Sequence, residues 1–163
     1  ARPVENINGD IVRLVNDMLE TMYPAPGVGL AANQVGALHR IIVLDVDHEN
    51  PRKNVYKLIN PAIVRAEGKI VWEEGCLSVV DFTAEVRRAA QVEVVALDEN
   101  EKETKIEAEG LLAVALQHEI DHLDGKLFID RISRLKRDLY TRKRKKMLRT
   151  GTPPPTENPR VMI

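Results

Sequence analysis

The stretch GLLAVALQHEIDH at residues 110–122 decides how the rest of the chain is arranged. Around a helix over residues 109–123, apolar side chains would face almost every direction until Gln117 and His118, which is typical of a buried helix. Short runs rich in Val, Ile and Leu precede it, at the length expected of strands. The sequence therefore predicts an α+β fold, in which short, mostly antiparallel strands form small sheets around one central buried helix.

The other elements follow from periodicity and turn residues. Apolar residues at helical spacing predict a helix over residues 10–22 that starts at Asn8 or Gly9, and a basic helix is expected over about 132–149, ended by Gly151. Residues 1–150 are expected to form a single domain, followed by an extended tail at 151–163 that contains three consecutive prolines. Strands are expected at residues 40–46, 55–59, 62–65, 69–72, 92–97 and 104–108, the last two forming a hairpin.

Composition restricts the class of protein. The chain has 163 residues, of which 44% are hydrophobic and 30% charged, as in soluble globular domains. Its longest purely apolar run, residues 111–116, is too short for a bilayer, and no signal peptide is expected from its first residues. A single cysteine, Cys76, excludes an internal disulfide and favours a reducing compartment such as the cytoplasm.

A net charge of −1 hides an uneven distribution. Residues 1–129 carry 13 Lys and Arg against 22 Asp and Glu, whereas residues 130–149 carry ten Lys and Arg against two Asp. A basic segment on an acidic body is typical of binding to a polyanion, but it also fits a solvated helix face that maintains solubility. The pattern alone favours neither interpretation.

The strongest chemical signal is the pair His118 and His122. Residues four positions apart share one face of a helix, so both imidazoles can bind one metal ion, and Glu119 can reach a water molecule beside it. Packing of two histidines in the core or on the surface is the structural alternative. The buried, apolar character of the preceding turns favours the metal site.

A catalytic metal site needs a third protein ligand and an open position. The acids that follow His122 are poorly placed for this role, and no third histidine follows it. Upstream, residues 73–78 (EEGCLS) contain the only thiol of the chain, flanked by glycine and charge after a predicted strand. Although a lone cysteine is often a small core residue, Cys76 is here the better candidate for the third ligand.

Three segments together resemble the peptide deformylase family: GVGLAANQ at residues 27–34, EGCLS at 74–78 and QHEIDH at 117–122. The resemblance extends over about residues 1–149. It implies a hydrolase that removes the N-formyl group from the initiator methionine of nascent chains. It also implies one divalent metal ion, iron(II) in the cell, with zinc, nickel or cobalt able to replace it.

The resemblance also implies a role for individual residues. Cys76, His118 and His122 would be the metal ligands, and Glu119 the general acid and base. Gln34 would donate a side-chain hydrogen bond, and Leu77 a backbone hydrogen bond, to the oxyanion that forms when the formyl carbon is attacked.

The substrate would lie in an apolar pocket shaped for methionine. For Leu30 and Leu111, ordinary core packing is an equally supported interpretation. The glycine-rich segment would let an extended peptide approach the backbone. The expected substrate-binding residues are Val28, Gly29, Leu30, Trp72, Glu74, Gly75, Leu111, Val114 and Ala115.

The chain departs from the family pattern in several places. Members usually have a further strand and helical turn before the part that matches Arg2, so we expect one sheet edge to pack differently here. Val80 stands where proline is common, Thr83 where arginine is common at the substrate lip, and Asn33 where a small hydroxyl residue is common. Because Thr83 lacks the charge of that arginine, contacts with the substrate backbone or with its downstream residues are expected to be weaker.

The resemblance further implies that the basic helix at 132–149 docks on ribosomal RNA, with Ile132, Leu135 and Leu139 anchoring it to the body. A monomer without membrane contact is expected, in the bacterial cytoplasm or alternatively in an organelle. Two other functions remain open: a catalytically weak metal scaffold that binds formylated termini or the ribosome, and a zinc endoprotease. The presence of Glu119 disfavours the first, and the lack of a downstream third ligand disfavours the second.

Overall fold

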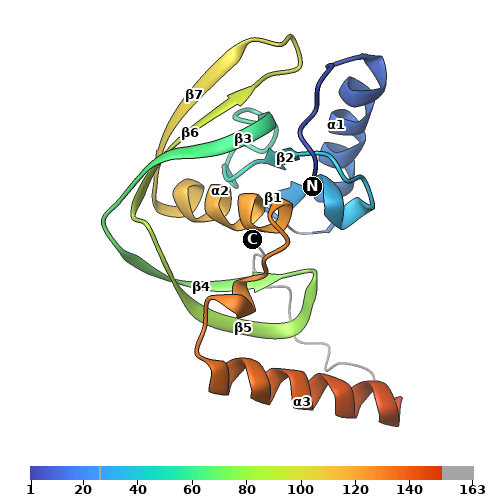
Figure 1. The fold of residues 1–163 in the computed structure, drawn as a ribbon, viewed down its shortest axis with the longest axis vertical. Helices are drawn as coiled ribbons and strands as arrows, with labels where there is room; N and C mark the ends of the chain where they lie inside the picture. The colour runs from blue at the N-terminus through green and yellow to red at the C-terminus, as the bar shows by residue number, and fades with distance from the viewer. Residues whose placement is uncertain (26, 152–163) are drawn as a thin grey trace.

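The computed structural model describes residues 1–25 and 27–151, and its strands form two antiparallel sheets on either side of one helix (Figure 1). Five strands lie in the order β1-β2-β3-β6-β7, and two form a β4-β5 ribbon. The central helix α2, Gly110–Leu123, lies between the sheet and the ribbon, which confirms the predicted α+β architecture. The strands are β1 Gly29–Ala31, β2 Ile41–Leu44, β3 Tyr56–Glu67, β4 Ile70–Cys76, β5 Val79–Arg88, β6 Gln91–Leu97 and β7 Glu103–Glu109.

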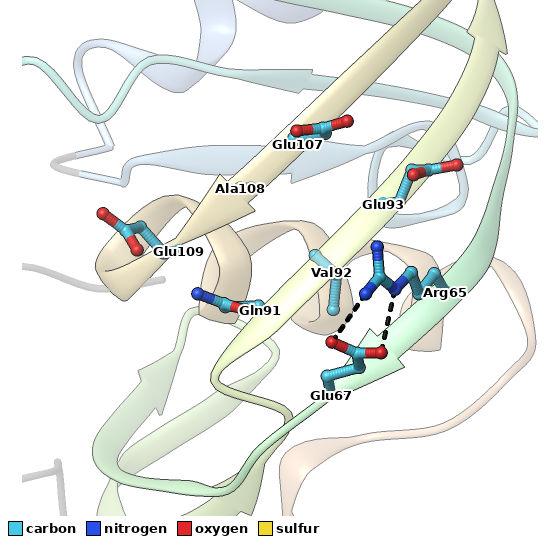
Figure 2. Close-up of a pocket in the computed structure, with 8 residues that line it drawn as sticks. All are labelled: Arg65, Glu67, Gln91, Val92, Glu93, Glu107, Ala108 and Glu109. Carbon is cyan, nitrogen blue, oxygen red and sulfur yellow. Dashed lines mark hydrogen bonds and ion pairs between the residues drawn. The ribbon is translucent and has the colours of Figure 1, made fainter.

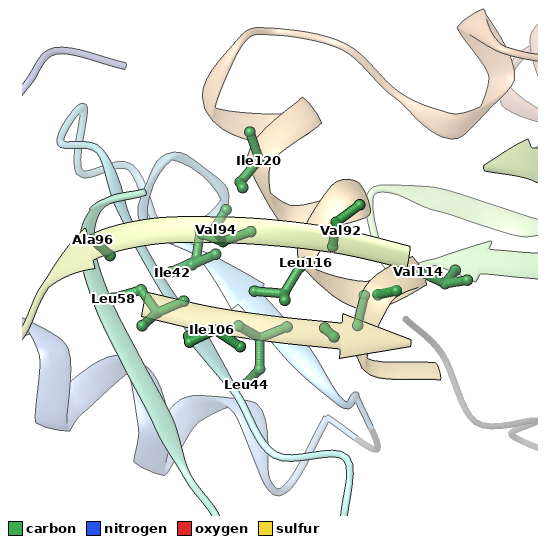
Figure 3. Packing of buried hydrophobic residues seen from close by; sticks show 14 of the residues in the cluster. Ile42, Leu44, Leu58, Val92, Val94, Ala96, Ile106, Val114, Leu116 and Ile120 are labelled. Atoms are coloured by element: carbon green, nitrogen blue, oxygen red, sulfur yellow. The ribbon is translucent and has the colours of Figure 1, made fainter. Parts of the chain in front are cut away.

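The main core forms where α2 packs on the five-stranded sheet (Figure 3). Val114 and Leu116 on the helix are completely buried, as are Ile42 and Leu44 on β2 and Val94 on β6. Burial of each such side chain stabilises the fold by about 1.5–3 kcal/mol relative to an exposed one. The helix is thereby held at a fixed position against five strands, so the polar residues of its last two turns have fixed directions.

A second core lies under the N-terminal helix α1, Gly9–Met22, which packs on β1 and β2. Its buried face includes Val15, Met18 and Met22, as the helical periodicity predicts. The Asn8 side chain accepts hydrogen bonds from two backbone amides of the first turn, which confirms it as the cap. This helix positions the glycine-rich segment that follows it.

Two strands predicted at 55–59 and 62–65 are one strand, β3, with irregular register between Ile59 and Ala62. Asn60 and Pro61 have the composition of a turn, but Asn60 takes a left-handed φ of 54° inside the strand. Its side-chain amide exchanges two hydrogen bonds of 2.8 Å with the backbone of Val4. These contacts stabilise a bulge where the sequence indicates a break.

The ribbon corrects two further expectations. The strand predicted at 69–72 continues to Cys76, so the thiol lies at the end of β4 and not in a loop after a strand. Strand β5 was not predicted from the sequence. Charged residues alternate with its buried positions, and its last buried residue, Arg88, is itself charged. A buried arginine is uncommon unless it is paired, and here it is.

The last helix, α3, spans Arg134–Thr150 and has Gly151 as its left-handed C-cap, close to the predicted bounds. The predicted anchor is wrong for two of its three residues, because Leu135 is 70% exposed and Leu139 is 57% exposed. Ile132 packs on the body as predicted, and Tyr140, which was not predicted, also does so, with its ring 4.7 Å from the Phe82 ring. These two leucines of α3 therefore do not attach the helix to the body. Of the tail predicted at 151–163, residues 152–163 lie outside the described residues.

None of the helices in the described part of the chain is both long and apolar enough to cross a bilayer.

Candidate metal centre and active site

Three potential ligands converge where α2 meets the end of β4. The ligand atoms of Cys76, His118 and His122 all lie within 4.8 Å of one another, and all three side chains are buried. The Sγ of Cys76 is 3.2 Å from Nε2 of His122, and the two imidazole rings are 4.8 Å apart. The structure thus brings together the three residues expected to hold a metal ion.

The donor set fits a divalent transition metal. The Nε2 atom of His118 is buried and makes no hydrogen bond within the described residues, although its Nδ1 lies 2.8 Å from Oε2 of Glu74. A carboxylate on Nδ1 fixes the tautomer that leaves Nε2 free to bind a metal. One thiolate and two imidazoles match the ligand preferences of zinc and iron(II), and three ligands leave a fourth position open.

The electrostatics of the ligands favour metal binding. Burial acts to raise the pKa of Cys76, but the imidazoles of His118 and His122 stabilise the thiolate and lower that pKa to about 6. Burial acts to lower the pKa of His118, but Cys76 and Glu74 outweigh it and raise the pKa. In the metal-free site a thiolate therefore faces an imidazolium, whose proton must leave when a metal binds.

Glu119 lies beside this site without a partner. It is fully buried, and neither carboxylate oxygen makes a hydrogen bond within the described residues. Burial raises its pKa from 4.5 to about 7. A carboxyl group that titrates near neutral pH and has both oxygens free is suited to accept and return a proton.

Gly29 makes room for this carboxylate. A Cβ atom built on Gly29 would lie 2.6 Å from Oε1 of Glu119 and 2.8 Å from its Cγ, far inside van der Waals contact. We expected this glycine to let a substrate approach the backbone. The structure shows a second reason for glycine here, namely that a side chain would collide with Glu119. Only glycine at this position of β1 lets Glu119 occupy its place.

Gln34 lies on the rim of the site in a fixed orientation. Its Oε1 accepts a hydrogen bond of 2.8 Å from the backbone N–H of Ala31, so its NH₂ group must point the other way. That group is 3.1 Å from Oγ of Ser78 and 3.9 Å from Sγ of Cys76. A side-chain N–H donor is thereby aimed at the space beside the thiol.

A cavity of about 240 Å³ opens next to Gln34. The predicted residues Gly29, Leu30, Gln34 and Leu77 line it. Its other lining residues come from the end of α1 and the turn after it, from the short 3-10 helix Ala32–Val35, and from the turn between β4 and β5: Thr21, Met22, Ala25, Gly27, Val35 and Ser78. The residues that line this cavity are mainly apolar, as binding of a methionine side chain requires.

The remaining residues predicted to bind substrate lie elsewhere. Val28, Val114 and Ala115 are at most 1% exposed in the main core, and Trp72 and Leu111 pack against it. Gly75 pairs with Thr83 in the ribbon. The carboxylate of Glu74 contacts His118 and Arg88. Substrate contact by these residues stays a prediction.

The six residues of the QHEIDH motif connect α2 to several parts of the fold. Gln117 exchanges hydrogen bonds of 3.0 Å with both backbone groups of Ala89, which fixes the helix against the turn between β5 and β6. Asn33 donates a hydrogen bond of 2.6 Å to the backbone carbonyl of His122. Sequence reasoning missed this contact, and the departure from a small hydroxyl residue at position 33 was its only signal.

Sequence reasoning also missed a buried ion-pair network behind His118. Arg88 binds Glu74 through Nε at 2.7 Å and Nη2 at 2.9 Å, and it reaches Oδ2 of Asp121 at 2.5 Å. Burial acts to raise the pKa of Glu74 and of Asp121, but their cationic partners hold both pKa values below the usual range. Both carboxylates therefore stay ionised inside the protein.

The outer face of the five-stranded sheet carries a second hollow, of about 330 Å³ (Figure 2). Its polar lining residues alternate along the strands with Val92 and Ala108, whose side chains belong to the main core, so the hollow faces away from α2. It contains none of the predicted site residues. Its lining is Arg65, Glu67, Gln91, Val92, Glu93, Glu107, Ala108 and Glu109.

The chain is similar in sequence and in fold to known proteins. The family model described as polypeptide deformylase matches residues 1–138. Peptide deformylases from Syntrophobacter fumaroxidans and Rhizobium meliloti are 52% and 56% identical, covering 93% and 91% of this chain and 89% and 86% of theirs. A crystal structure of a peptide deformylase from Legionella pneumophila is 46% identical with a TM-score of 0.85, covering 95% of this chain and 90% of that one. The chain therefore belongs to the polypeptide deformylase family of enzymes.

Proposed function

We propose that the chain is a metal-dependent hydrolase that removes the N-formyl group from the N-terminal methionine of nascent polypeptides and releases formate. The observation that carries the proposal is the convergence of Cys76, His118 and His122 beside a buried, unpartnered Glu119. Family membership supports the reaction, and the donor set supports one divalent metal ion. Iron(II) is the proposed native metal, with zinc, nickel or cobalt able to replace it.

Each residue near the site has a separate task. A divalent metal held by Cys76, His118 and His122 supplies Lewis acidity, which favours ionisation of water near neutral pH. Glu119 takes the proton of the attacking water and delivers it to the departing amine, a task for which a pKa of about 7 is well matched. The oxygen of this water bonds to the formyl carbon, the C–N bond of the formamide breaks, and formate is released together with the free amine.

Two donors stabilise the oxyanion that develops on the formyl group. The Gln34 amide is held by Ala31 with its N–H groups towards the site, so it needs no reorganisation during the reaction. The backbone N–H of Leu77, one residue beyond the thiol, is the proposed second donor. Loss of one such donor typically lowers the rate by about 10²–10³-fold.

The cavity beside Gln34 is the proposed start of the methionine site. A charged side chain would lose its hydration in this apolar lining, so formyl-Met peptides should be preferred over formyl-Glu peptides by at least about tenfold in kcat/KM. Equal values for the two substrates would show that the pocket assignment is wrong.

Formate release from formyl-Met-Ala-Ser, compared with cleavage of the unformylated peptide, tests the reaction. Glu119→Gln should keep the metal and lose turnover, whereas Cys76→Ala should lose stoichiometric metal. Glu107→Gln, on the outer face of the sheet, is the matched control and should change neither. Cleavage of internal peptide bonds would indicate an endoprotease, and peptide binding without turnover would indicate a binding protein.

The basic helix α3 supports a second part of the proposal. We propose that it docks on ribosomal RNA and that the protein acts in the cytoplasm. None of its residues is buried, so its basic side chains are accessible to phosphates. Each phosphate contact releases counterions, and affinity should therefore fall steeply with salt.

A further inference from the structure

An unbroken chain of alternating charges runs from the surface to the metal site. Arg131 contacts both carboxylate oxygens of Asp121 at 2.5 Å. Asp121 accepts a hydrogen bond from Arg88 at 2.5 Å, and Arg88 grips both oxygens of Glu74. The same Oε2 of Glu74 lies 2.8 Å from Nδ1 of His118. Four contacts thus connect the segment before α3 to a predicted metal ligand.

The members of this chain differ greatly in exposure. The side chains of Glu74 and Arg88 are at most 1% exposed and that of Asp121 is 8% exposed, whereas Arg131 is 39% exposed. The three inner groups carry two negative charges and one positive charge. Arg131 supplies the second positive charge, so it is the group that neutralises the set.

Loss of Arg131 would change how Arg88 is shared. With both cations present, Asp121 has a bidentate partner of its own and Arg88 can keep two contacts with Glu74. Without Arg131, Arg88 is the one arginine of this network left for two buried carboxylates, and an uncompensated buried charge is costly. The guanidinium is then drawn towards Asp121, and the Glu74 carboxylate loses the support that holds it on His118.

We propose that Arg131 is a positioning residue for the metal site, which acts on His118 through Asp121, Arg88 and Glu74. The inference rests on the proposed function, because it takes His118 as a metal ligand. Groups that orient a metal-binding histidine influence both its tautomer and its basicity. Arg131 lies in none of the three segments that carry the family resemblance, so the sequence gives no hint of this role.

A purely structural role is the alternative, since Arg131 also ties the segment between α2 and α3 to the body. Arg137 provides a matched control in the same region: it pairs with Asp130 at 3.0 Å and makes no contact with the network in the described structure. Arg131→Met and Arg137→Gln each remove one ion pair near the start of α3. Only the first should reach the metal.

Metal affinity and spectroscopy separate the two roles. Competition with a chelator should give a Co²⁺ dissociation constant about tenfold higher in Arg131→Met than in the wild type, and unchanged in Arg137→Gln. The visible absorption bands of bound Co²⁺ should shift in the first variant only. A lower melting temperature with unchanged affinity and spectrum would overturn the proposal and leave a structural role.

A double-mutant cycle tests the route. Glu74→Gln interrupts the chain next to His118, so adding Arg131→Met to it should cause no further loss of affinity. Losses that multiply in the double variant would show that Arg131 does not act through Glu74. If Arg131→Met does not fold, Arg131→Lys keeps the charge without the bidentate geometry and should weaken binding by about threefold, with the same dependence on Glu74.

Different results would refute the metal site and the role of Arg131. Wild-type protein that binds no stoichiometric Co²⁺ or Zn²⁺ would refute the proposed metal site itself. Wild-type binding that Arg131→Met leaves unchanged would refute only the role of Arg131.

Discussion

Replacement of Glu119 by glutamine should change how the stability of the metal-free protein depends on pH. The carboxyl group is fully buried and its oxygens make no hydrogen bond within the described residues, so burial raises its pKa from 4.5 to about 7. Because the raised pKa belongs to the folded state, the folded protein holds this proton more tightly than the unfolded chain does. The contribution of this carboxyl group to the free energy of unfolding is therefore highest below about pH 4.5 and falls as the pH rises towards 7.

The size of the effect follows from the two pKa values. One unit of pKa corresponds to about 1.4 kcal/mol, so above pH 7 the buried carboxylate costs about 3 kcal/mol of unfolding free energy. At pH 5 the cost is still below about 1 kcal/mol. Glutamine has nearly the same shape and does not ionise. The stability of Glu119→Gln relative to the wild type should thus rise by about 2–3 kcal/mol between pH 5 and pH 8.5.

Urea unfolding of both metal-free proteins, under reducing conditions at the two pH values, measures this difference. The thiol and the histidines are common to both proteins, so most of their titration cancels in the comparison. Glu107→Gln, an exposed change on the outer sheet face, should leave the pH dependence as in the wild type. A Glu119→Gln difference that stays constant with pH would refute the buried, proton-holding state of this carboxyl group.

Three further predictions test other parts of the structure. Gly29→Ala places a Cβ 2.6 Å from Oε1 of Glu119, so turnover of a formyl-Met peptide should fall. We expect a loss of at least about 10²-fold at unchanged metal content, and undiminished turnover would show that the carboxylate can act from another position. Arg88→Met leaves two buried carboxylates without their shared partner, so urea unfolding should show a loss of about 3–5 kcal/mol, and a loss below about 1 kcal/mol would contradict the pairing. A chain that ends after Tyr140 keeps the aromatic anchor of α3 and should turn over a short formyl peptide normally while co-sedimenting less with ribosomes at low salt; undiminished co-sedimentation would refute the docking role.

The central helix and the candidate metal ligands could be predicted from sequence for local reasons. The apolar run before Gln117 requires burial whatever packs around it, and the spacing of His118 and His122 places both on one helix face. Cys76 was found by elimination, as the only thiol of the chain. Helix α1 and the β6-β7 hairpin could also be predicted, because their periodicity and turn residues match the way they pack in the folded protein.

Features that depend on distant partners could not be predicted. Strand β5 carries Arg88 on its inward face, a position that is favourable only when Glu74 and Asp121 are already in place. The leucines of α3 suggested an anchor, yet the helix is attached through Tyr140 because the Phe82 ring lies next to that residue. Gly29 lies against the side chain of Glu119, which is 90 residues further along the chain, and no local sequence pattern predicts this contact.

The sequence by itself determined which residues of this protein can bind a metal and move a proton, because ligand type and helical spacing are local properties. Only the tertiary structure decided the state of those groups. Burial without a partner sets the pKa of Glu119, and a chain of contacts ending at Arg131 holds Glu74 on His118. Burial and ion pairing arise from the packing of segments far apart in the chain, so they exist only once the fold has formed.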